Sequence, residues 1–230
     1  MNQKRIMIPT ESVSDWKSLL AEPEKQWRPG YSAMLTAQSW ETAGDLPPVI
    51  KSVFVESEGD FFNNLELLIA IPEYKTNLKG GLRPSQSDVF ALLRSDIILV
   101  AVTVEGKARE DFGPSMKQWE NKVSAKGYIE RLGHIMENTG LEKSAPDHIR
   151  YQLLHRTASA VIEAKRFHCQ IAVMIVQSFV ESDDENHFGD YADFIGLYGA
   201  TPVKNQLIFL ADIDGTLLFS AWVYTSPGQA

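Results

Sequence analysis

The segment from Ile97 to Val104 constrains the fold most strongly, because β-branched residues dominate it. Side chains alternate between the two faces of an extended chain, and here each face is consistent along its length. One face carries Ile98, Val100, Val102 and Val104, and the other carries Leu99, Ala101, Thr103 and Glu105. The segment therefore predicts a strand that has one face richer in branched residues.

Other segments predict further strands and several helices around this one. Apolar runs bounded by turn residues predict strands at 65–71 and 171–176, and a β-hairpin of 206–210 and 217–223 around Asp214-Gly215. Apolar residues at helical spacing predict helices near 13–20, 33–40 and 49–54, two between 115 and 140, and further ones near 147–166 and 190–198.

Helices precede and interleave the predicted strands. We therefore expect an α/β fold with a mixed central sheet flanked by helices. The 230 residues form one expected domain, with a core at about 49–179. A helical extension at 1–48 precedes this core, and a helix and hairpin at 180–230 follow it.

Composition indicates an ordinary globular chain, with 44% hydrophobic and 23% charged residues. Cys169 is the only cysteine, and no apolar stretch approaches the roughly 20 residues that cross a bilayer. We expect a cytoplasmic protein with no membrane partner. The net charge of −8 argues against a strongly basic nucleic-acid clamp. However, residues 75–166 carry 15 Lys and Arg against 11 Asp and Glu, which is compatible with phosphate contact.

A set of polar residues surrounds the end of the strand at 97–104. Glu105 and Lys107 are two residues apart, so their side chains point to the same face. If Asp88 to Arg94 is a strand that turns at Ser95-Asp96, antiparallel pairing places Asp88 opposite about residues 103–105. Two carboxylates suit Mg²⁺, and a neighbouring lysine can stabilise charge on a phosphate. The set predicts metal-dependent phosphodiester hydrolysis.

Pro84 and Asp88 followed by Glu105-Gly106-Lys107 resemble the signature of the PD-(D/E)xK nuclease superfamily. The resemblance covers 49–179 and implies a restriction-endonuclease-like fold whose core runs helix, three strands, helix, strand. It implies Asp88 and Glu105 as ligands of Mg²⁺ or Mn²⁺, and Lys107 as the catalytic lysine.

The same resemblance implies a further acidic ligand, Glu66 in preference to Glu73, and a polar catalytic residue on the core helix, Gln152, with Arg156 one turn on. The expected partner is DNA or RNA. The phrase around Glu-Gly-Lys also resembles uncharacterised bacterial proteins of this superfamily.

Several alternatives remain open for these residues. Ser85 to Asp88 also fits the capping box of a short helix. Glu105 with Lys107 could be a surface pair, and Gln152 with Arg156 a solvated helix face. The whole chain could be a non-catalytic binding or assembly module on the same fold, or an unrelated α/β enzyme.

Two other features allow more than one interpretation. Asp212 to Leu217 matches a phosphatase motif, but only fourteen residues follow Thr216, so we interpret the motif as a hairpin turn. Four tryptophans are compatible with a homo-oligomer interface and equally with core packing: Trp16, Trp27, Trp40 and Trp222.

Overall fold

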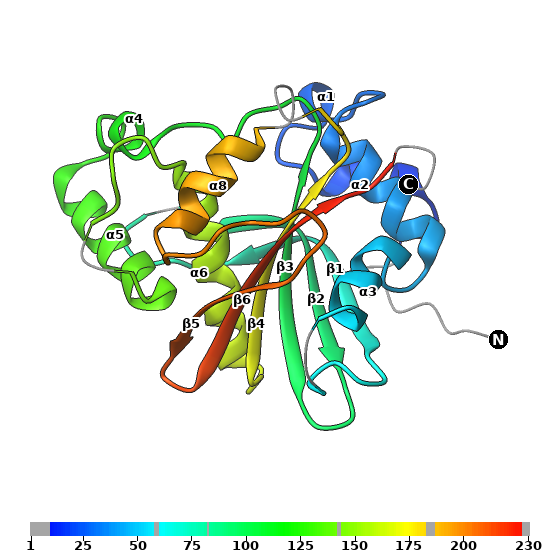
Figure 1. Cartoon of the computed structure of the whole chain (residues 1–230). Helices are drawn as coiled ribbons and strands as arrows, with labels where there is room; N and C mark the ends of the chain where they lie inside the picture. Colours follow the sequence, from blue (N-terminus) through cyan, green and yellow to red (C-terminus); the bar gives the residue numbers. More distant parts are fainter. Residues whose placement is uncertain (1–9, 58–59, 82, 142–143, 183–186, 227–230) are drawn as a thin grey trace.

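A computed structural model describes residues 10–57, 60–81, 83–141, 144–182 and 187–226 (Figure 1). The outermost residues of the expected N- and C-terminal segments, 1–9 and 227–230, lie outside this part of the chain. The helices are the 3₁₀ helix η1 (Val13–Leu19), α1 (Pro23–Gln26), α2 (Ser32–Ala43), α3 (Pro48–Val55), α4 (Met116–Glu120), α5 (Ala125–Thr139), α6 (Tyr151–Arg166) and α8 (Phe188–Gly196). The strands are β1 (Glu66–Thr76), β2 (Ser85–Arg94), β3 (Leu99–Lys107), β4 (Ile171–Ser178), β5 (Ile208–Ile213) and β6 (Thr216–Tyr224).

The six strands form one mixed sheet in the order β1-β2-β3-β4-β6-β5. β1, β2 and β3 form an antiparallel meander, β4 and β6 run parallel to β3, and β5 returns antiparallel to β6. Parallel neighbours need a long crossover, and the α5–α6 region supplies it between β3 and β4. The expected α/β class with a mixed sheet flanked by helices is confirmed.

Two sequence expectations about strands are corrected. The alternative that Ser85 to Asp88 opens a helix is wrong, because these residues belong to β2. The strand predicted at 65–71 does not end at Pro72 but continues to Thr76. A proline is compatible with β1 because this strand lies at the edge of the sheet, where one side of the backbone needs no partner.

Helices cover both faces of the sheet (Figure 1). The face of β3 that carries Val100, Val102 and Val104 packs against α2 and α3. The face that carries Ala101 packs against α5, α6 and α8. Both faces of the central strands are apolar because each meets a helical layer.

One buried amide, Gln177 of β4, connects segments from both ends of the chain. Its Oε1 accepts a hydrogen bond from Trp40 Nε1 at 3.1 Å, and its Nε2 donates to Ser39 Oγ at 2.9 Å. The same Nε2 donates to Thr225 Oγ1 at 3.1 Å, just after β6. Gln177 therefore fixes helix α2 and the end of β6 against the middle of the sheet.

The ambiguous motifs are resolved by their positions. Asp214 and Gly215 form the turn between β5 and β6, so the phosphatase-like motif lies in the predicted hairpin. Trp16, Trp40 and Trp222 are buried in the core of this one chain, as the core-packing interpretation expects. In the described ranges, no helix has the length and apolar character of a membrane span.

Candidate active site

The pairing of β2 with β3 brings the predicted residues together. Val89 pairs with Val104, so Asp88 comes level with Glu105, as the hairpin argument predicts. Asp88 Oδ2 accepts a hydrogen bond of 2.7 Å from the backbone N–H of Gly106. Lys107 completes the set, because its Nζ lies 3.0 Å from Glu105 Oε1.

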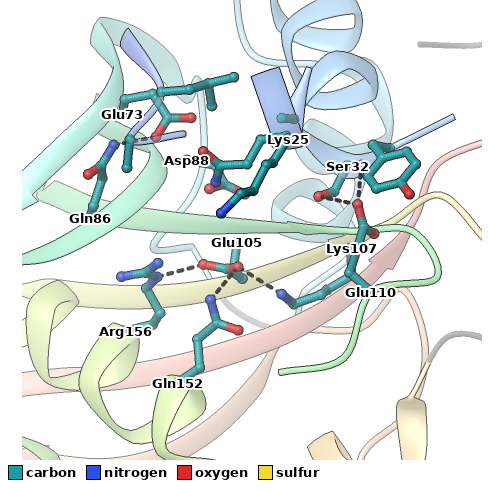
Figure 2. A pocket seen from close by; sticks show the side chains of 15 residues that line it. Lys25, Ser32, Glu73, Gln86, Asp88, Glu105, Lys107, Glu110, Gln152 and Arg156 are labelled. Carbon is teal, nitrogen blue, oxygen red and sulfur yellow. Dashed lines mark hydrogen bonds and ion pairs between the residues drawn. The ribbon is translucent and has the colours of Figure 1, made fainter. Parts of the chain in front are cut away.

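Glu105 is the centre of a buried network, in which it and Lys107 are only 4% and 5% exposed. Gln152 Nε2 donates to Glu105 Oε1 at 2.7 Å, and Arg156 Nε donates to Oε2 at 2.5 Å (Figure 2). Both donors come from one face of α6, where residues four apart are neighbours. The interpretations as a surface pair and a solvated helix face are therefore wrong.

The acidic residue that β1 contributes is Glu73, not Glu66. Glu66 lies at the exposed start of β1, where it pairs with Arg94 at 3.0 Å. Glu73 lines the same pocket as Asp88 and Glu105, and its Oε2 accepts a hydrogen bond from Gln86 at 2.7 Å. The preference for Glu66 is corrected because β1 extends well past Pro72 and carries Glu73 to the level of Asp88.

Glu73 has an unusual backbone conformation for a strand residue, with φ of +52°. Residues other than glycine adopt this left-handed region at a cost of about 1–3 kcal/mol. Such strain is often found at functional sites, where the surrounding structure holds it in place.

The pKa values of the carboxylates of Asp88, Glu73 and Glu105 are shifted in different directions. Burial and the negative charge of Glu105 raise the pKa of Asp88 to about 7. Burial and the charge of Asp88 raise the pKa of Glu73 well above its usual value. Burial opposes ionisation of Glu105 as well, but Arg156 and Lys107 outweigh it and lower its pKa. The lowered pKa of Glu105 favours its ionised form, whereas the raised pKa values of Asp88 and Glu73 show that a second and third negative charge are disfavoured here unless a cation offsets them.

These residues line a pocket of about 390 Å³ between the N-terminal helices and α6. Lys25 and Ser32 line it from the N-terminal side, facing the strand residues (Figure 2). Glu110 accepts hydrogen bonds from Ser32 at its rim. The pocket combines four carboxylates, those of Glu73, Asp88, Glu105 and Glu110, with several cations, and this mixture suits a phosphate ester held beside a metal ion.

The carboxylate oxygens of the pocket could supply some, but not all, of the ligands of a hard cation. Within the described ranges, no three His, Cys, Asp or Glu side chains are already arranged as a metal cage. Asp88 and Glu73 each use one carboxylate oxygen in a hydrogen bond to Gly106 or Gln86, and the other oxygen can bind an ion. A cation that keeps several waters, as Mg²⁺ does, needs only one or two such carboxylates.

A known protein-family model matches nearly the whole chain. The model of DUF6946, a domain of unknown function, matches residues 9–227. The chain belongs to the DUF6946 family. No curated protein and no solved structure matches it. In this DUF6946 chain the matched range includes every strand and the complete pocket.

Sequence reasoning missed two features of the site. Gly106 allows α2 to approach β3, because a Cβ there would lie 2.1 Å from Thr36 Oγ1 and 3.1 Å from Asp88 Oδ2. A glycine between the Glu and the Lys of a buried strand was a signal of such a close approach. Lys25 had no such signal, because its place in the pocket depends on how the N-terminal helices pack.

Proposed function

We propose that this protein hydrolyses phosphodiester bonds of DNA or RNA with Mg²⁺ or Mn²⁺ as cofactor. The observation that carries the proposal is the convergence of Asp88, Glu105 and Lys107 at the end of β3, with Glu73 beside them. The element order also supports a restriction-endonuclease-like fold, because α3 precedes the β1–β3 meander and α6 leads into a parallel β4. A cytoplasmic location remains part of this proposal.

Each residue has a distinct role in the proposed site. Asp88 and Glu73 would hold the ion, which would supply Lewis-acid chemistry toward a phosphoryl oxygen. Lys107 would orient the attacking water or stabilise negative charge on the phosphate. Its Nζ is held by Glu105 at 3.0 Å and by the Asp111 carbonyl oxygen at 3.3 Å. Gln152 and Arg156 fix the carboxylate of Glu105, which in turn fixes Lys107.

One observation favours a second candidate, a non-catalytic binding module on the same fold. Both oxygens of Glu105 are already engaged, by Lys107 and Gln152 on one side and by Arg156 on the other. A carboxylate whose charge is neutralised in this way gains less from a metal ion than a free one does.

The test combines metal binding with cleavage. Calorimetric titration of Mn²⁺ and Mg²⁺ should show binding that Asp88→Asn weakens, and labelled single- and double-stranded DNA and RNA should be cleaved. Lys107→Ala should abolish cleavage while the circular dichroism spectrum stays unchanged. Glu66→Gln is the matched control, because Glu66 is an exposed carboxylate of the same sheet outside the pocket.

Cleavage that survives in folded Lys107→Ala would reject the role of this lysine. A wild type that neither binds metal nor cleaves any of the four substrates would favour the binding module.

A further inference from the structure

A second pocket, of about 530 Å³, lies on the other side of Arg156 from the metal-site carboxylates. Three cationic side chains line it: Arg83 from the β1–β2 connection, Lys122 after α4, and Arg131 from α5. Among the residues that the structure describes, no Asp or Glu belongs to its lining, although the chain as a whole carries a net charge of −8. A cavity with this composition attracts anions.

Arg131 is the most informative of the three cations, because its side chain is buried with only 6% of the residue exposed. Its Nη2 donates to the Arg83 carbonyl oxygen at 2.6 Å. Within the described parts of the chain, no carboxylate pairs with this guanidinium. A buried guanidinium is costly without a negative partner, so the pocket offers a place that an anion would complete.

The β1–β2 connection is built to hold Arg131 in place. A Cβ on Gly80 would lie 2.3 Å from the Arg131 backbone nitrogen, and a Cβ on Gly81 would lie 2.4 Å from its Nη2. At Gly80 the atoms met are backbone, including the Gly127 carbonyl oxygen at 2.7 Å, so only glycine allows the connection to lie this close to α5 there. The hydrogen bond to the Arg83 carbonyl oxygen holds the buried guanidinium before a ligand arrives, which lowers the entropy lost on binding.

Aromatic side chains line the same pocket as the three cations. Trp119 and Tyr151 stack with ring centroids 4.0 Å apart and an interplanar angle of 9°. His155 lies next to Tyr151, and burial together with Arg156 and Arg131 lowers its pKa, so its ring is neutral at neutral pH. Ser85 Oγ contacts His155 Nδ1 and accepts a hydrogen bond from Arg156, so this pocket adjoins the Glu105 network.

We propose that this second pocket binds a phosphate group, carried either by a free nucleotide or by a nucleic-acid strand. Arginine guanidinium groups match the geometry of phosphate oxygens, and Lys122 adds an exposed cation to the lining. The site is separate from the metal-site carboxylates and needs no metal ion, so it stands whether or not the chain is a nuclease.

The test is calorimetric titration in EDTA with inorganic phosphate, a nucleoside 5′-monophosphate and a single-stranded oligonucleotide. Arg83→Gln and Lys122→Gln change exposed side chains and should each weaken binding about three- to tenfold. Arg131→Gln should abolish ligand binding. Arg131→Lys, which conserves the positive charge, is the variant to compare with it. Lys51→Gln is the control, because Lys51 is an exposed cation on α3 that lines neither pocket.

Tighter binding of the oligonucleotide than of the mononucleotide, with affinity that falls as salt rises, would identify a strand as the source of the phosphate. Equal binding of the two would identify a free nucleotide. The proposal is overturned if none of the three ligands binds, or if Arg83→Gln and Lys122→Gln bind as well as the wild type. It is also overturned if Lys107→Ala, rather than these variants, loses binding, because the anion would then lie in the first pocket.

Discussion

Arg156 Nε lies 2.5 Å from Glu105 Oε2, and this contact joins helix α6 to the end of strand β3. The two side chains are 9% and 5% exposed. Lys107 is the second cation on the same carboxylate, so the end of β3 carries a buried charge cluster rather than one isolated pair. The stability of this cluster depends on the presence of all three charged side chains, those of Glu105, Lys107 and Arg156.

We expect Arg156→Met to lower the free energy of unfolding by about 2–4 kcal/mol, because Glu105 would keep only Lys107 as a cationic partner. Urea denaturation measures this loss. The double variant Arg156→Met with Glu105→Gln should recover much of it, since it leaves no uncompensated carboxylate. Wild-type stability in the single variant would show that the ion pair contributes nothing.

Asp88 should make the protein less stable as pH rises. Its pKa is about 7 in the folded chain and 3.8 in the reference state, so between these values the folded state binds more protons than the unfolded state. Stability therefore falls from about pH 4 to about pH 7. Glu73, whose pKa is also raised, adds to the same slope.

Asp88→Asn should remove most of this dependence. At about pH 8 the variant should be more stable than the wild type by roughly 2–4 kcal/mol, and the difference should disappear near pH 4. Thermal or urea denaturation across this range measures it. A difference that does not change with pH would contradict the raised pKa.

Gly106→Ala should destabilise the protein by about 1–3 kcal/mol, because its Cβ would overlap Thr36 Oγ1. Thr36→Ala removes the overlapping hydroxyl, so the double variant should be more stable than the sum of the two single changes predicts. The matched control is Gly133→Ala in α5, where a Cβ meets nothing within 4 Å. That change should stabilise the helix by about 0.5–1 kcal/mol. Equal effects at both glycines would reject the close approach at Gly106.

Glu73→Gly should separate stability from ligand binding. Glycine adopts a φ of +52° without strain and removes a partly buried carboxylate, so the free energy of unfolding should not fall. The affinity for Mn²⁺ should fall, because one proposed ligand is lost. Calorimetry and urea denaturation on the same sample measure both quantities, with Glu66→Gln as the control. A marked loss of stability would show that Glu73 is a structural residue.

Local sequence features predicted the part of the site that a short hairpin controls. The turn near Ser95-Asp96 fixes the register of β2 on β3, so simple counting placed Asp88 opposite Glu105. The alternation along β3 predicted correctly which residues share a face of the sheet, but not which helices cover each face.

The rest of the site depends on contacts that cannot be predicted by counting residues along the chain. The β1–β2 connection is longer, and β1 contains a register shift between Leu67 and Ile69 and a left-handed residue at Glu73. The choice between Glu66 and Glu73 therefore required the full strand pairing. That Arg156 is buried against Glu105, and that Lys25 lines the pocket, depends on helix packing, which the sequence pattern leaves open.

The amide of Gln177 has a consequence for how the protein is made. On a ribosome, helix α2 emerges early and Thr225 emerges only after the whole of β6, yet the side chain of Gln177 holds both. Contacts between such distant parts of a chain form late in folding. We therefore expect the hydrogen bonds of Gln177 to be completed only after β6 has left the exit tunnel, so the fold described above would be reached after translation of this segment rather than during it.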